Sequence, residues 1–434
     1  PLIFVQFASL KIKEEFPWKK VVYLAILAVL LPYLANIYRA GALEENLVGE
    51  TLKNMRSAED RFYLWQSTVQ MIKDHPFLGT GLASFFFYYP HYRMPLDRSD
   101  GFFAHMDPLQ FWAETGIWTP VFFYGVLISV LLRTVYAVRA AGDNRRLRLE
   151  IMAPFCAMLA LTGHTHITFH LYMPGMLLPL SGLLSYWYMA TERALGDAGD
   201  RLVWNPALKL RWAAMAGLAV VVIIAGGWVM RASGATYLMG QVQKAAQGND
   251  REAALSKLKL AGKVGPGSYS RFYEYEARFR VNHLWSHAKQ MNKEAARKVY
   301  EEAMYYLDEA EKRNPAYTAI WDLRARAHYA VNGVLLGDGD RMAKALLHKV
   351  LEANPLAADS RVGLANIYQS EGDLKSAVQV LEAGAKWPRQ KGRVDLTYLV
   401  TLANLKRQLG DLRAYEMYMK EAQSRARRYG MTIQ

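Results

Sequence analysis

Long apolar runs in the first half of the chain constrain its fold more than any other feature. A helix of about 20 residues crosses a ~30 Å hydrocarbon layer, and a helix satisfies its own backbone hydrogen bonds in lipid. Runs of about this length predict five membrane-spanning helices, over residues 21–38, 117–137, 151–169, 174–189 and 212–230. The expected fold is therefore all-α, with a polytopic membrane domain.

The composition of the chain changes after residue 230. Of the 434 residues 52% are hydrophobic, yet residues 231–434 have the composition of a soluble helical protein, rich in Ala, Leu, Lys, Arg and Glu. We therefore expect a membrane domain at 1–230 and a soluble helical domain at 231–434. The sequence begins with Pro1 and shows no signal peptide, so we also expect further membrane helices upstream in a longer protein.

Basic residues beside the apolar runs indicate how the chain crosses the membrane. They cluster at 11–20, 139–148 and 193–211, which all fall on one side if each run spans once. Short basic flanks stay in the cytoplasm. We therefore expect a multi-pass protein of a bacterial inner membrane, with residues 39–116 and 231–434 in the periplasm.

Charge and cysteine content narrow the expected partners. The net charge is +14, and roughly +11 of it lies after residue 230, which favours phosphates, anionic lipids or acidic glycans. The basic residues are scattered and no nucleic-acid motif is visible, so nucleic acid is not expected as a partner. Cys156 is the single cysteine and excludes an intrachain disulfide.

The soluble half contains degenerate repeats. The segments 372–377 and 410–414 are near copies of a Gly-Asp turn, and 248–253 is a looser third copy. Pro315 and Pro355 follow helices about one repeat apart. These features resemble tetratricopeptide repeats, whose period is ~34 residues, and imply an α-solenoid that binds a protein partner, an acceptor or a glycan. Generic helical hairpins without a ligand are the alternative.

A connection of about 75 residues, 39–116, separates the first two predicted spans, and connections of such length are commonly functional. An apolar stripe predicts a helix over 57–73, with Ser57 and Asp60 as a capping box. The glycines of 79–81 predict a tight turn after this helix.

A second helix is expected near the end of the same loop. Asp107 is the predicted N-cap, Pro108 the first helical residue and Gly116 the end. His105 then lies just ahead of the positive end of a helix, where its imidazole should stay neutral and able to accept a proton. The same helix end favours an anion such as a phosphate.

Three segments of the loop resemble the periplasmic loop of the O-antigen ligase and polymerase family, and His105, Gly116 and Thr119 also match the spacing of that family. The segments are Arg61-x3-Trp65, His75-Pro76-Phe77-Leu78-Gly79-Thr80-Gly81-Leu82-x2-Phe85 and Ala104-His105-x-Asp107-x-Leu109-Gln110-x3-Glu114-x-Gly116. The resemblance implies transfer of a glycan from an undecaprenyl-pyrophosphate carrier to an acceptor hydroxyl, by a metal-independent, inverting reaction without a cofactor.

The resemblance also implies residue roles. His105 would be the general base, and Arg61 and, less firmly, Arg93 would bind the diphosphate. A solvated helix position is the alternative for Arg61, and a backbone contact is the alternative for His105.

The chain departs from the family at three positions. Phe103, Met106 and Pro108 stand where the family often has His, Asn and Tyr, and Met106 cannot hydrogen-bond as Asn would. Glu114 is interpreted as structural.

Histidines cluster at the end of the third predicted span, at 164, 166 and 170. His166 and His170 are expected on one helix face, four residues apart, where they could contact a glycan or the diphosphate. No further carboxylate or thiol ligand is near in sequence, so a metal is not expected. A structural or interfacial role is the alternative.

The acceptor is left open by the sequence. Lipid A core would make the protein a ligase, a protein hydroxyl an O-oligosaccharyltransferase, and a growing repeat unit a polymerase. The fused repeats slightly favour a protein acceptor or partner. A non-catalytic, membrane-anchored scaffold for envelope assembly is the hypothesis from another class, and the absent Asn and Tyr favour it.

Overall fold

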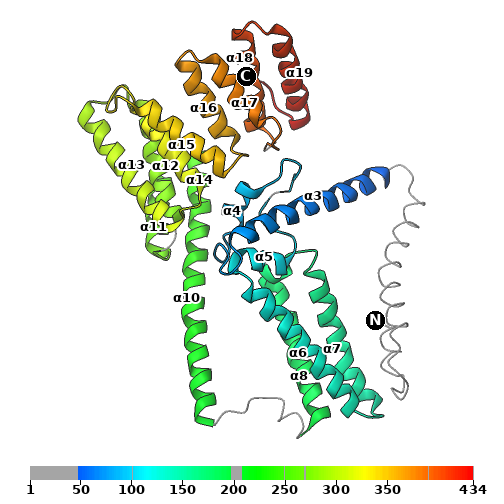
Figure 1. Ribbon diagram of the computed structural model, residues 1–434. Helices are drawn as coiled ribbons and strands as arrows, with labels where there is room; N and C mark the ends of the chain where they lie inside the picture. The colour runs from blue at the N-terminus through cyan, green and yellow to red at the C-terminus, as the bar shows by residue number, and fades with distance from the viewer. Residues whose placement is uncertain are drawn as a thin grey trace. The chain divides into compact units, whose positions relative to one another are not determined.

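The computed structural model describes residues 47–99, 101–196, 208–248, 250–267, 270–389 and 391–433 (Figure 1). The regular elements in these ranges are helices, which confirms the all-α prediction. The chain divides into two compact units, Pro1–Asn205 and Pro206–Gln434. The predicted boundary at residue 230 lies inside one long helix, because a helix satisfies its own backbone and can continue from an apolar into a polar segment.

The N-terminal unit contains two groups of helices. The group α3, α4 and α5 packs together, and α6 contacts α5 as well as α7 and α8, which pack on each other. The bounds are α3 Leu47–Asp74, α4 Phe85–Tyr92, α5 Asp107–Thr115, α6 Trp118–Ala140, α7 Arg145–His164, the 3₁₀ helix η1 His170–Tyr172, and α8 Pro174–Leu195. The predicted start of the first loop helix at Ser57 is wrong, since α3 already includes it.

The C-terminal unit is a row of antiparallel helix pairs, α10 with α11, α12 with α13, α14 with α15, α16 with α17 and α18 with α19. The bounds are α10 Leu208–Gln247, α11 Arg251–Val264, α12 Ser270–His287, α13 Lys293–Arg313, α14 Thr318–Ala330, α15 Gly339–Ala353, α16 Ala358–Ser370, α17 Leu374–Gly384, α18 Arg393–Gln408 and α19 Leu412–Tyr429. The predicted helix-turn-helix rhythm is confirmed.

The predicted Gly-Asp turns join paired helices. Gly372 and Gly410 adopt φ values of 84° and 83°, a left-handed conformation that glycine adopts without strain. The following aspartates, Asp373 and Asp411, accept hydrogen bonds from backbone N–H groups three residues on, at 3.0 and 3.1 Å. Asp250 caps α11 in the same way, at 3.0 Å from the nitrogen of Ala253. The repeated motif is therefore a repeated helix start.

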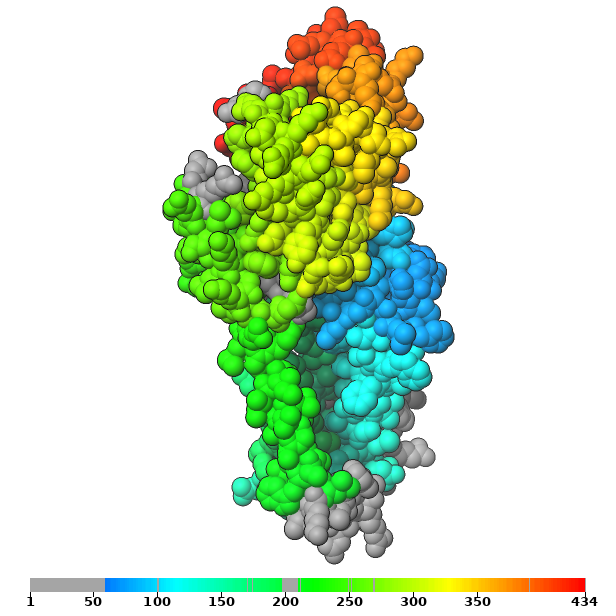
Figure 2. Space-filling view, turned by 90° about the vertical axis from the view of Figure 1, so that its left-hand side faces the viewer, coloured from blue at the N-terminus to red at the C-terminus, as the bar shows by residue number. Residues whose placement is uncertain are grey.

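Two helices in the described residues are long and apolar enough to cross a membrane by length and composition, at Trp118–Ala140 and Trp212–Gln247. The first is α6, and the second lies in α10, many of whose apolar side chains are exposed (Figure 2). The predicted spans 151–169 and 174–189 correspond to α7 and α8, and their membrane assignment stays a prediction. The predicted span 21–38 lies outside the described residues.

Candidate active site

His105 occupies a backbone conformation that its neighbours impose. Its φ is +52°, in the left-handed region, which costs a residue other than glycine about 1–2 kcal/mol. Both backbone groups of the preceding residue, Ala104, are held by side chains. Its N–H donates to Oε1 of Gln110 at 2.9 Å, and its carbonyl accepts from Nε1 of Trp65 at 2.9 Å. Contacts from α5 and α3 therefore fix the backbone that presents His105.

The N-terminus of α5 differs in detail from the prediction. Asp107 is the first residue of the helix, and the N-cap position belongs to Met106. The N-cap prediction for Asp107 is wrong, because its carboxylate Oδ2 accepts the N–H of Leu171 at 2.9 Å. The N–H of Asp107 donates to the carbonyl of Thr165 at 2.9 Å. These contacts tie His105 to the segment after α7 and place a buried carboxylate at this helix end.

A cluster of aromatic rings lies on one side of the imidazole of His105. Phe169 lies edge-on to it, with ring centroids 5.0 Å apart, and stacks on Phe103 at 4.4 Å. Tyr172 stacks on Phe111 at 5.0 Å. Phe103, which departs from the family pattern, thus forms part of an apolar wall beside a half-buried His105.

Glu114 joins three segments of the site. Its carboxylate is fully buried and accepts hydrogen bonds from the N–H groups of Ala83 at 2.7 Å and Phe85 at 3.2 Å. It also accepts from Nε2 of Gln110 at 3.2 Å and from the hydroxyl of Tyr172 at 2.8 Å. Burial and the nearby charge of Glu114 raise the pKa of Tyr172, so its hydroxyl stays a donor. Glu114 is linked to the backbone beside His105 by hydrogen bonds through Gln110 to Ala104.

Two glycines of the signature allow a close backbone crossing. A Cβ on Gly116 would lie 1.9 Å from the carbonyl oxygen of Phe77, and one on Gly79 would lie 2.3 Å from the carbonyl carbon of Glu114. The crossing is closed by a backbone hydrogen bond from Gly81 to the carbonyl of Glu114 at 2.7 Å. The spacing of the motif thus reflects the packing of the predicted 79–81 turn on the end of α5.

Two family comparisons match parts of the chain. Residues 2–124 match the family described as O-antigen ligase, and residues 342–396 match the family described as tetratricopeptide repeat. The chain thus has an N-terminal region similar to the O-antigen ligase family and a C-terminal segment similar to tetratricopeptide repeats. The family of this region supports, in general, a glycan-transferring function at a membrane.

Other comparisons add little. No curated protein matches the chain. Among solved structures, a chain described as "Crystal structure of MamA protein" is similar at 14% identity and a TM-score of 0.31, over 46% of this chain and 98% of that one.

In the O-antigen ligase region the two predicted diphosphate ligands have different surroundings. Arg61 is half-buried on α3, one turn from Trp65 on the same face, and makes no ion pair with a residue that the structure describes. Because Trp65 contacts Ala104, this face of α3 adjoins the backbone of His105.

Arg93 is buried in an ion pair. Its Nε lies 3.1 Å from Oδ2 of Asp97, both side chains are nearly inaccessible, and Arg93 also donates to the carbonyl of Ser99. Tyr89 donates to the same carboxylate, and burial followed by the charge of Asp97 raises the pKa of Tyr89. The diphosphate role of Arg93 stays a prediction, and its contacts give it a structural role within this segment.

The predicted helix face shared by His166 and His170 is wrong. Helix α7 ends at His164, the chain turns, and His170 begins η1. Nδ1 of His166 lies 2.9 Å from the carbonyl oxygen of Thr162, which can only accept, and Nε2 lies 2.9 Å from the hydroxyl oxygen of Tyr124. His166 therefore bridges α7 and α6, and the substrate contacts predicted for both histidines stay untested.

Sequence reasoning missed the contribution of the segment after α7. Phe169 and Tyr172 contact His105, Phe103 and Glu114 although they lie about 60 residues away in the sequence. An aromatic residue at the end of an apolar run is expected at any membrane interface. Its residue type therefore does not indicate that it belongs to a functional site.

Proposed function

We propose that the chain transfers a glycan from an undecaprenyl-pyrophosphate carrier to an acceptor hydroxyl at the periplasmic face of a bacterial inner membrane. The observation that carries the proposal is His105, held in a left-handed conformation ahead of α5 within a region of the O-antigen ligase family. Strained residues fixed by their surroundings are concentrated at functional sites.

The proposed reaction uses His105 as a general base. The imidazole takes the proton of the acceptor hydroxyl while the hydroxyl oxygen attacks the anomeric carbon of the carried glycan. The bond from this carbon to the pyrophosphate breaks, and the electron pair leaves with the undecaprenyl pyrophosphate. Attack from the face opposite the leaving group inverts the anomeric centre. The diphosphate is already a good leaving group, so no metal or cofactor is part of the proposal.

Arg61 is the proposed partner of the leaving diphosphate. A guanidinium binds phosphate oxygens in a bidentate manner and stabilises the charge that grows on them. Its lack of an ion pair among the described residues, and its position on the face of α3 that carries Trp65, support this role. Arg93 is the second proposed ligand, and it would have to leave Asp97 to reach a diphosphate.

The acceptor is proposed to be lipid A core or a protein hydroxyl. A growing glycan, which would make the protein a polymerase, is the alternative within the family. The repeats support a protein acceptor or a partner, because stacked helix pairs offer an extended binding surface.

The test is transfer by the full chain from an undecaprenyl-pyrophosphate-linked glycan to each acceptor, with release of undecaprenyl pyrophosphate as a common readout. We expect His105→Ala to lower the rate by about 10²–10⁴-fold, the usual contribution of a general base. Arg61→Ala should also lower it strongly. The matched controls are His91→Ala and Arg98→Ala, which alter exposed residues of the same loop.

A His105→Ala protein that keeps most of its activity would contradict the base assignment. A wild-type protein that transfers no glycan, binds an envelope partner through its repeats and is indifferent to both substitutions would instead be the scaffold.

A further inference from the structure

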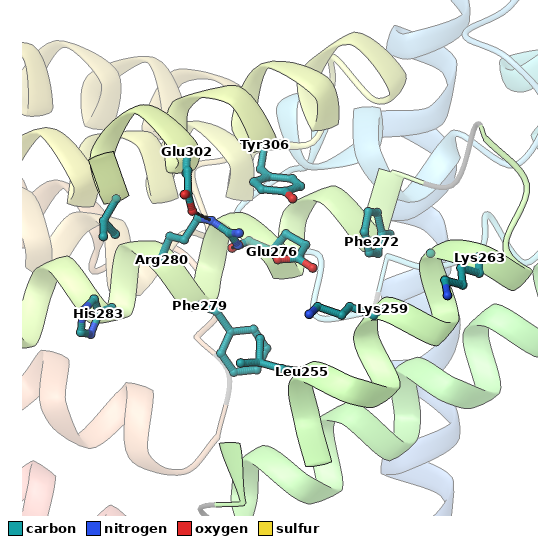
Figure 3. A pocket seen from close by; sticks show the side chains of 12 residues that line it. Leu255, Lys259, Lys263, Phe272, Glu276, Phe279, Arg280, His283, Glu302 and Tyr306 are labelled. Atoms are coloured by element: carbon teal, nitrogen blue, oxygen red, sulfur yellow. Dashed lines mark hydrogen bonds and ion pairs between the residues drawn. The ribbon is translucent and has the colours of Figure 1, made fainter. Parts of the chain in front are cut away.

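A cavity of about 660 Å³ opens within the C-terminal unit, between α11 on one side and α12 with α13 on the other (Figure 3). Its volume lies in the range of small-molecule sites, which is roughly 300–1,000 Å³. It is outside the region that matches the O-antigen ligase family and outside the residues that match the repeat family. Neither comparison therefore assigns it a ligand.

One wall of the cavity carries two lysines. Lys259 and Lys263 lie one turn apart on α11, both are exposed, and neither makes an ion pair with a described residue. Figure 3 shows Lys259 reaching from α11 into the space that faces Glu276 and Phe279. Like charges at this spacing destabilise a helix slightly. An anion bound between them would relieve this repulsion.

The opposite wall combines carboxylates with an immobilised arginine. Arg280 donates to Oε2 of Glu276 at 2.5 Å and to Oε2 of Glu302 at 2.8 Å, and its guanidinium lies 4.3 Å from the ring centroid of Tyr306. Each carboxylate has more acceptor sites than Arg280 uses. This wall can therefore accept hydrogen bonds from hydroxyl groups.

Aromatic rings form the remaining surface. Phe279 and Tyr306 line the cavity with Phe272, whose ring lies so close to α11 that a Cβ on Gly262 would be 2.5 Å from it. Rings of this kind have a negative face that attracts the partly positive C–H groups of a pyranose. The combination of rings and hydroxyl acceptors fits a sugar.

We propose that this cavity binds an acidic sugar residue of the uronic acid class, with its carboxylate at Lys259 and Lys263, its hydroxyls at Glu276 and Glu302, and its C–H face on Phe279. The inference rests on the proposed function, since it names a feature of the glycan that the protein handles. An acidic peptide is less well matched, because none of the lining residues is an Asn or Gln that could pair with both groups of a peptide backbone.

The experiment is calorimetric titration of the full chain in detergent micelles with trigalacturonate, with maltotriose as the neutral control and hexaglutamate as the acidic peptide. We expect trigalacturonate alone to bind. The Lys259→Gln, Lys263→Gln double variant should weaken binding by about tenfold, the effect of losing two partly exposed ion pairs. The matched double variant Lys289→Gln, Lys293→Gln changes two exposed lysines outside the cavity and should stay within about twofold.

Phe279→Leu keeps an apolar side chain but removes the ring, and it should weaken binding by about threefold through lost stacking. Equal binding of maltotriose, tighter binding of hexaglutamate, absence of trigalacturonate binding, or equal loss in both lysine variants would each overturn the proposal. His105→Ala should bind trigalacturonate normally. Loss of trigalacturonate binding with glycan transfer intact would thus be distinguishable from loss of transfer with binding intact.

Discussion

The loop around His105 and the repeat unit are both helical, but different kinds of contact hold them. At the loop, single side chains bind groups that are distant in sequence: Trp65 donates to the carbonyl of Ala104 and Tyr172 donates to the carboxylate of Glu114, 39 and 58 residues apart. In the repeat unit, many ion pairs connect residues one turn apart, such as Arg313 with Glu309. The loop therefore depends on a few irreplaceable contacts, whereas stacked repeats spread their stability over neighbours.

Matched glycine substitutions should give the largest difference in stability between the loop and the repeats. Gly116→Ala should destabilise the loop by about 4 kcal/mol, because a left-handed alanine adds to a clash with the carbonyl of Phe77. Gly410→Ala, with a similar φ but nothing within 4 Å of the added Cβ, should cost only about 1 kcal/mol. Hydrogen exchange of the two turns measures both. Equal effects would show that the backbone crossing at Gly116 does not matter.

Asp395→Asn tests whether the repeat unit also contains an irreplaceable group. This carboxylate is buried and contacts Nε of Arg389 at 2.7 Å, Nη1 of Arg425 at 2.8 Å and the hydroxyl of Tyr429 at 2.9 Å. Burial alone would raise its pKa, but the hydrogen bonds from Arg425 and Arg389 lower it below the usual value. Loss of the charge should lower the free energy of unfolding by about 3 kcal/mol, and hydrogen exchange of α18 and α19 measures this change. The exposed Asp359→Asn is the control, and a similar small change in both would refute the idea.

Glu114→Gln tests a single buried group inside the loop. All four partners of Glu114 donate hydrogen bonds, so an amide would direct its own N–H groups at donors. We expect a loss of about 2 kcal/mol in the protection of residues 81–86, and slower transfer through a displaced His105. Glu59→Gln, an exposed change on α3, should alter neither quantity. Unchanged exchange in Glu114→Gln would remove Glu114 from the network.

The smallest expected effect is a pH dependence in the repeats. Burial, with Arg324 as the second cause, lowers the pKa of His328 below its ordinary value of 6.5, and its Nδ1 lies 2.8 Å from the hydroxyl of Tyr300. The unfolded state then binds a proton that the folded state excludes, so stability is complete above pH 6.5 and falls as the pH decreases below it. Protection of α14 should drop roughly threefold more in the wild type than in His328→Gln between pH 7 and 5.5. Identical slopes would contradict this prediction.

The sequence predicted helix ends and turns well where proline, glycine or a capping residue sets them. The end of α3 before His75-Pro76 and the end of α5 at Gly116 follow from proline and glycine chemistry, and both appear as expected. The Gly-Asp turns of the repeats also follow from capping. The failures at Ser57, at Asp107 and at the helix face shared by His166 and His170 share a cause, since each was a local helix signal and the helix begins or ends at another residue.

Sequence alone determined the all-α class, the two different halves, the repeats and the position of His105 ahead of a helix, because periodicity, capping and apolar length act over a few residues. Which groups contact His105 and its backbone follows from the tertiary fold. Trp65, Gln110 and Phe169 come from three separate segments, and their contacts depend on chain crossings such as the one at Gly79 and Gly116. Such crossings depend on the packing of several segments at once, which no stretch of sequence encodes by itself.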